Sequence, residues 1–220
     1  TFFGTATAQN SCFQYTGDTA GFSLSVDTVA TDVVGGMNTY RVYLNTPSTD
    51  DFLSAVIGDA NDPLFLNTTT SFYQDNLGGS TAAAINPLLF DMPDFASVQY
   101  DSWVTIGIDQ QPNLLEGETD VAVLVDPNIE SWEVEFSSGG NLDISSPIGG
   151  GWYILANSVN GIAGEDKRVL IAQVTTDGDL SGQFYMQIFP NADQSQLIES
   201  RFGFETISCG ASGCTDSAAC

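Results

Sequence analysis

The side chains best suited to chemistry in this sequence are its carboxylates, because Asp and Glu together number 28 against four Lys and Arg and no His. Two short segments bring carboxylates close together: Asp59 and Asp62 in GDANDP, and Asp177 and Asp179 in TTDGDLSG. Oxygen ligands suit Ca²⁺, so both segments are candidate calcium sites. Neither has the complete ligand spacing of a calcium-binding loop, and we therefore expect no firmly defined metal site and no other cofactor.

The lack of histidine excludes several common catalytic arrangements. Ser-His-Asp and Cys-His pairs need an imidazole, and so does a His-ligated zinc site. The lysine in AGEDKRV, Lys167, does not follow a glycine-rich phosphate-binding loop. Paired carboxylates remain able to hydrolyse a glycosidic bond, so a hydrolase of that type is kept as an alternative. The expectation is that the protein is not an enzyme.

The formal net charge of −24 determines which partners the chain can accept. Such a field repels nucleic acid and anionic membrane surfaces, and we expect neither as a partner. No segment reaches the roughly 18 consecutive apolar residues that a membrane-spanning helix requires, so no membrane insertion is expected. The charge is typical of a protein that stays in solution outside the cell or at the cell surface.

The four cysteines lie at the two ends of the chain, at Cys12, Cys209, Cys214 and Cys220. A zinc site of four cysteines normally uses two closely spaced pairs, and this spacing does not provide them. Disulfides are typical of secreted domains, although four cysteines allow more than one pairing. We expect Cys12–Cys209, which would join the first and last strands, and Cys214–Cys220, which would close the tail.

One glycosylation sequon is present at Asn67-Thr68-Thr69. It lies in a polar, loop-like stretch that continues through Thr70. Asn67 is therefore the expected acceptor of an N-linked glycan if the source organism glycosylates its secreted proteins.

The elements that position these residues are predicted to be almost entirely β-strands. Short runs of β-branched and aromatic residues alternate with turn clusters, which the 22 Gly and 8 Pro supply. This pattern predicts a single antiparallel β-sandwich, jelly-roll-like, with its ends joined by a disulfide. Segment 80–90 has room for only a single helical turn before Pro87. The predicted strands are 38–45, 52–59, 97–108, 121–125, 131–136, 151–157, 168–176, 182–189 and 200–207.

Three local expectations follow from the strand pattern. In 131–136, Trp132, Val134 and Phe136 would share one buried face. In 97–108, Trp103 would point away from the face that carries Val104, and it would either pack or offer a flat platform to a sugar. Gly178, in the turn between two strands, is free to take a positive φ.

Two stretches, YDSWVTIGI (100–108) and RVLIAQVTTDGDLSGQFYMQIF (168–189), resemble a domain that recurs in large secreted and surface proteins of aquatic microbes. In that domain a DS-aromatic-V-T-I-G strand lies mid-domain and a VL-x-x-Q-x-TT-x-G-x-x-SG hairpin lies near its end. The tail GCTDSAAC (213–220) is similar to the start of a cysteine repeat, G-C-T-D-x-x-A-C, found in arrays in such proteins. The resemblance implies an extracellular β-rich module with an architectural or adhesive role, and it supplies no catalytic residue.

Three parts of the chain are therefore expected: an N-terminal arm (1–8), a sandwich domain (9–208) and a cysteine-rich tail (209–220). The arm carries no charge and contains Phe2 and Phe3, which would be a liability if exposed on so acidic a protein. Docking the arm into a neighbouring copy would bury them and would build a homopolymeric filament or surface matrix. The alternative is a carbohydrate-binding adhesion module, assisted by calcium, within a larger secreted protein.

Overall fold

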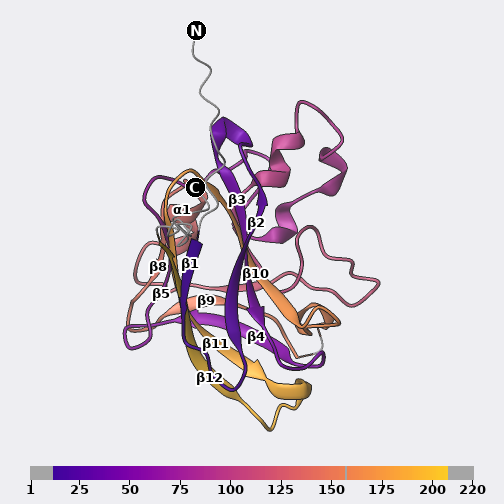
Figure 1. Ribbon diagram of the computed structural model, residues 1–220, viewed down its shortest axis with the longest axis vertical. Helices are drawn as coiled ribbons and strands as arrows, with labels where there is room; N and C mark the ends of the chain where they lie inside the picture. The colour runs from indigo at the N-terminus through magenta and orange to yellow at the C-terminus, as the bar shows by residue number, and fades with distance from the viewer. Residues whose placement is uncertain (1–11, 157, 208–220) are drawn as a thin grey trace, which may run out of the picture.

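The computed structural model describes residues 12–156 and 158–207, which form two antiparallel β-sheets (Figure 1). The larger sheet has eight strands in the order β1-β12-β11-β4-β9-β7, and β5 also pairs with β11 and with β8. Its strands are β1 (Cys12–Thr16), β4 (Phe52–Gly58), β5 (Leu64–Thr68), β7 (Ala122–Leu124), β8 (Leu142–Ile144), β9 (Gly150–Tyr153), β11 (Leu180–Phe189) and β12 (Ile198–Ile207).

The smaller sheet has four strands in the order β2-β3-β10-β6. They are β2 (Ser23–Ala30), β3 (Asn38–Asn45), β6 (Trp103–Val104) and β10 (Arg168–Thr176). One short helix, α1 (Trp132–Ser137), and six 3₁₀ turns are the other regular elements of the described residues. The 3₁₀ turns are η1 (Val34–Gly36), η2 (Ala82–Ala84), η3 (Pro87–Leu89), η4 (Ala96–Tyr100), η5 (Val159–Gly161) and η6 (Pro190–Ala192). Among the described residues, no helix has the length and hydrophobicity needed to cross a membrane.

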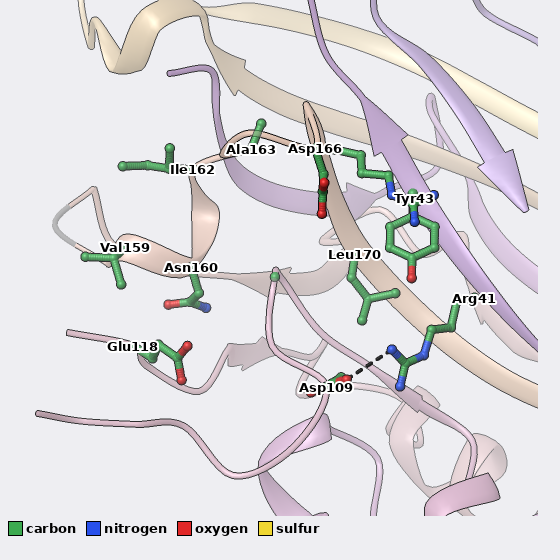
Figure 2. Close-up of a pocket in the computed structure, with 12 residues that line it drawn as sticks. Arg41, Tyr43, Asp109, Glu118, Val159, Asn160, Ile162, Ala163, Asp166 and Leu170 are labelled. Atoms are coloured by element: carbon green, nitrogen blue, oxygen red, sulfur yellow. Dashed lines mark hydrogen bonds and ion pairs between the residues drawn. The ribbon is translucent and has the colours of Figure 1, made fainter. Parts of the chain in front are cut away.

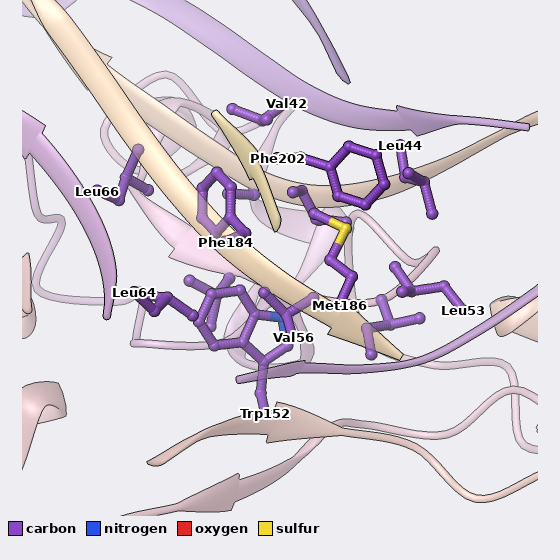
Figure 3. Packing of buried hydrophobic residues seen from close by; sticks show 14 of the residues in the cluster. Val42, Leu44, Leu53, Val56, Leu64, Leu66, Trp152, Phe184, Met186 and Phe202 are labelled. Carbon is purple, nitrogen blue, oxygen red and sulfur yellow. The ribbon is translucent and has the colours of Figure 1, made fainter. Parts of the chain in front are cut away.

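Both sheets contribute to one hydrophobic core, so the nearly all-β fold is sandwich-like (Figure 3). Side chains alternate across β11, and Phe184, Met186 and Ile188 are fully buried on its inner face. Val42 and Leu44 of β3 enter the same cluster from the smaller sheet, together with Trp152 of β9. The jelly-roll-like connectivity expected from the sequence stays a prediction.

A second, smaller core lies on the opposite face of β10. Val169 and Ile171 belong to the main core, whereas Leu170 between them packs against Ile85 and Trp103. The long segment between β5 and β7 therefore covers part of the smaller sheet on its outer side. This cover forms one wall of the groove described below.

Two of the predicted strands have the observed bounds. The predicted bounds 38–45 and 168–176 coincide with β3 and β10. The pattern missed β1, β2, β5 and β8, of which β1, β5 and β8 are short and β2 is half polar.

The predicted strand at 131–136 is wrong, because this segment forms helix α1. Trp132 and Phe136 are buried one helical turn apart, while Val134 is 55% exposed, so the apolar pair follows the helical period. The Ser131 side chain accepts a hydrogen bond from the backbone N–H of Glu133 at 3.3 Å and caps the first turn.

The predicted core strand at 97–108 is also wrong over most of its length. The 3₁₀ turn η4 occupies its first part, and only Trp103 and Val104 pair with β10. Trp103 is 1% exposed, so it packs inside the protein and does not form a sugar-stacking platform.

Candidate functional site

A groove of about 420 Å³ lies on the outer side of the smaller sheet (Figure 2). Strands β3 and β10 provide its base, the loop from Gly107 to Glu118 one wall, and the segment around η5 the other. We call it the arginine groove and define it by Arg41, Tyr43, Asp109, Asn160, Asp166 and Arg168.

Arg41 enters the arginine groove from β3, two residues before Tyr43 and therefore on the same face of the strand. Its Nη1 lies 3.0 Å from Oδ2 of Asp109, the contact drawn in Figure 2. Its Nε donates to Oε1 of Gln173 at 2.9 Å, and its guanidinium lies 5.9 Å from the centroid of the Trp103 ring. These contacts fix the position of the guanidinium.

Arg168 enters the groove from the first residue of β10. Its Nη1 lies 2.7 Å from Oδ2 of Asp27, and the hydrogen bond to this carboxylate raises the pKa of the guanidinium further. The guanidinium is stacked 4.0 Å from the centroid of the Tyr43 ring, which is the geometry of a cation–π contact. One face of Tyr43 is therefore already covered.

Asn160 holds the two walls of the groove together. Its Nδ2 donates to the carbonyls of Ile106 and Thr119 at 2.5 and 3.1 Å, and its Oδ1 accepts from the N–H of Thr119 at 3.0 Å. Gly107 lies against it with φ +79°, and a Cβ at this position would fall 1.6 Å from the Asn160 carbonyl oxygen. Only glycine fits this approach, so Gly107 allows the two walls to come into close contact.

The charges of the groove are largely neutralised within it. Arg41 and Arg168 are two of the chain's four cations, and each has a carboxylate partner. Glu118 and Asp166 add further carboxylates to the lining. Donors and acceptors therefore lie side by side in the groove, and the net charge of −24 opposes the binding of an anion.

The first pair of candidate calcium ligands is already engaged in other contacts. Oδ1 of Asp59 accepts from the N–H groups of Asn61 and Asp62 at 2.6 and 2.9 Å. The N–H groups of Asp62 and Asn61 hold the pKa of Asp59 below its ordinary value. The Asp62 carboxylate forms an ion pair with Arg201.

The second pair lies in the turn between β10 and β11, as predicted. Oδ1 of Asp177 accepts from the Thr70 hydroxyl at 2.7 Å, and the N–H of Asp179 donates to the Thr69 hydroxyl at 2.9 Å. Gly178 is not at positive φ. It is needed because a Cβ would fall 2.5–2.9 Å from three threonine hydroxyls, those of Thr68, Thr69 and Thr70. Within the described part of the chain, no group of three or more His, Cys, Asp or Glu side chains has the geometry to hold a metal ion.

Asn67 does not lie in a loop, because it belongs to β5, which pairs with β11 on one side and with β8 on the other. The residue is half-buried, and its Oδ1 is buried without a hydrogen-bond partner among the described residues. Its glycosylation stays a prediction.

The remaining predicted residues are at the chain ends. Cys12 begins β1 and lies opposite Ile207 of β12, two residues before Cys209 in the sequence. Cys209, Cys214 and Cys220, like Phe2 and Phe3, lie outside the described residues. The predicted disulfides and the predicted arm contact therefore stay predictions.

Sequence reasoning missed Asp101, a fully buried carboxylate. Its Oδ1 accepts from the N–H of Asp75 at 2.6 Å and its Oδ2 from the N–H of Gly79 at 2.9 Å. Burial is the main cause that raises its pKa to about 6. The sequence YDSWVTIGI does not reveal that Asp101 is buried, because the residues that contact its carboxylate, Asp75 and Gly79, are more than 20 positions away in the chain.

The comparisons with known proteins add no relative. No family model, no curated protein and no solved structure matches the chain. Its function has to be inferred from its own geometry and charge.

Proposed function

We propose that this chain is a non-enzymatic structural protein, the subunit of an extracellular filament or surface matrix assembled through residues 1–8. The observation that supports the proposal is the position of the sheet edges. Strands β1 and β7 end the path of the larger sheet at opposite sides, and in the described chain each pairs with one strand only. An open edge accepts an added strand. A contact between opposite edges is heterologous and repeats from copy to copy.

The composition of residues 1–8 is that of a segment that becomes buried in a contact with another copy. The segment TFFGTATA has no charge, while the chain as a whole has a net charge of −24. In the sequence, three residues separate this apolar segment from the edge strand β1, and we expect the segment to leave its own sheet and enter a neighbour. Burial of two phenylalanines would contribute roughly 2–3 kcal/mol each to such a contact.

Removal of residues 1–8 should abolish assembly and leave a folded monomer. The truncated chain should be compared with the full chain and with a variant in which the eight residues are replaced by a Gly/Ser segment of the same length. Electron microscopy and light scattering report assembly, and thermal unfolding reports folding. Ordered polymers that persist without these residues would contradict the proposal.

A second candidate function is carbohydrate binding, which the arginine groove favours. It offers fixed guanidinium donors, carboxylate acceptors and the edge of Tyr43 in one hollow. Uncharged sugars are recognised by paired donors and acceptors of this kind beside an aromatic ring.

The substitution Arg168→Met should weaken binding of any glycan held in the groove by about 10- to 100-fold, because a charge-assisted hydrogen bond is lost. Arg201→Met is the matched control, since Arg201 also pairs with an aspartate but lies outside the groove. A glycan array identifies the ligand, and titration with and without EDTA tests for calcium. Equal affinities of the two variants, or no bound glycan, would count against this function.

A further inference from the structure

Exposed apolar side chains gather at the open edge formed by β7. Leu124 and Ile148 line one hollow of about 180 Å³ together with Ile57 and Tyr185. Ile129 lines a second hollow with Trp132 and Ile144. The two hollows are neighbours, because Gly150 lines the first and the adjacent Gly149 lines the second. The exposed fractions are 42% for Leu124, 40% for Val125, 58% for Ile129 and 61% for Ile148. We call these four residues the β7 surface.

The rim of the β7 surface is acidic. Asp59 and Asp62 line the first hollow, and Asp126, Glu130 and Asp143 line the second. An acidic partner would be repelled here, whereas an apolar segment without carboxylates meets no electrostatic penalty. Residues 1–8 of this chain have that composition.

We propose that residues 1–8 of a second copy dock on the β7 surface as an added strand beside β7. This inference rests on the proposed function and names its acceptor site. Successive side chains of a strand point to opposite faces of the sheet, so one of Phe2 and Phe3 lies on the same face as Leu124 and packs against its exposed side chain. The backbone of the segment pairs with the edge of β7 that bears no other strand in the described chain, where the Leu124 carbonyl already accepts a hydrogen bond from Nε1 of Trp132 at 3.0 Å.

The position of β1 explains why the occupant comes from another copy. Four strands, β12, β11, β4 and β9, separate β1 from β7 in the larger sheet. At about 4.8 Å per strand the two edges are roughly 24 Å apart. When the β1 edge of one copy faces the β7 edge of the next, the segment that precedes β1 in the sequence is supplied to β7 by the facing copy. The same step then repeats along a filament.

The test uses two full-length variants that each remove one half of the contact. Phe2→Ser/Phe3→Ser removes the donor, and Leu124→Gln/Ile148→Gln removes the acceptor. Leu88→Gln/Leu114→Gln is the matched control, because both leucines are 74% exposed and lie away from the β7 surface. The donor variant and the acceptor variant should each be monomeric, and the control should assemble like the parent chain. An equimolar mixture of the donor and acceptor variants, the two half-variants, should form a one-to-one pair and nothing larger. Light scattering and native mass spectrometry measure these states.

The outcomes separate this inference from the proposed function. If the donor variant is monomeric but the acceptor variant assembles, or if the two half-variants do not pair, the β7 surface is not the acceptor and the proposed function stands. If the donor variant still assembles, the proposed function falls as well. If the parent chain is monomeric and the donor variant only lowers its melting temperature, the segment folds back on its own chain and both proposals are overturned.

Discussion

Replacing Trp152 by alanine should lower the free energy of unfolding by about 3–5 kcal/mol, the range expected for the loss of a large core side chain. Trp152 is fully buried in β9, with its ring centroid 5.9 Å from that of Trp132 and 6.5 Å from that of Phe184. It lies opposite Val56 of β4 and Val123 of β7. A cavity at this point would therefore loosen three neighbouring strands of the larger sheet.

A milder substitution separates packing from hydrogen bonding. Nε1 of Trp152 donates to the carbonyl of Thr105 at 2.9 Å, whereas Nε1 of Trp103 has no hydrogen-bond partner among the described residues. Trp152→Phe leaves a buried carbonyl unsatisfied, and Trp103→Phe does not. We expect Trp152→Phe to cost about 1–3 kcal/mol more than Trp103→Phe.

Urea unfolding of the two Trp→Phe variants measures this difference directly. The contact of Trp103 with Arg41 adds about 0.5–1 kcal/mol to the cost of Trp103→Phe, so the net difference between the two variants is smaller by that amount. Equal losses for the two variants would show that the hydrogen bond to Thr105 contributes no more than the contact of Trp103 with Arg41.

The elements that could be predicted from the sequence are those whose local pattern agrees with their tertiary position. In β3 the buried residues Tyr40, Val42 and Leu44 alternate with partly exposed ones, and the predicted bounds coincide with the strand. In α1 the apolar positions Trp132, Val134 and Phe136 fit a period of two, but the buried pair Trp132 and Phe136 fits the helical period equally well. Six residues are too few for the pattern to decide, and tertiary packing decides instead.

The arginine groove could be predicted only in part. Scarcity of cations singles out Arg41 and Arg168 in the sequence, and both fall in correctly predicted strands. Their common site depends on the pairing of β3 with β10, which joins residues far apart in the chain. Sequence patterns do not give that pairing, nor the close approach of Gly107 to Asn160.

Raising the pH from 4 to 7 should destabilise the protein, and Asp101→Asn should remove a large part of this dependence. Burial raises the folded-state pKa of Asp101 from 3.8 to about 6. The folded state therefore holds its proton more tightly than the unfolded state does. The stability contributed by this group is fully present below about pH 4 and is lost as the pH rises through about 6. The loss amounts to about 3 kcal/mol at pH 7.

The pKa of Asp75 is lowered in the folded state, so its effect on stability has the opposite sign to that of Asp101. It therefore sets the lowest pH at which the test is made. Burial acts to raise the pKa of Asp75, but hydrogen bonds from Ser97, Leu77 and Tyr73 together hold it below its ordinary value. Its contribution is present above about pH 4 and is lost only in stronger acid. Measurements between pH 4 and 7 therefore isolate Asp101 from this neighbour.

The slope of the unfolding free energy against pH is the quantity to measure, because Asp101→Asn also changes the absolute stability. The asparagine NH₂ must face the N–H of Asp75 or of Gly79, both of which now donate to the carboxylate. This mismatch costs about 1–3 kcal/mol at every pH.

The net charge of −24 adds a general repulsion that grows with pH in every variant. The exposed Asp50→Asn variant measures that general part. If Asp101→Asn and Asp50→Asn have the same slope, the buried carboxylate does not carry the pH dependence. If only the slope of Asp101→Asn is flattened, the protonation of Asp101 accounts for the stability that the protein loses between pH 4 and 7.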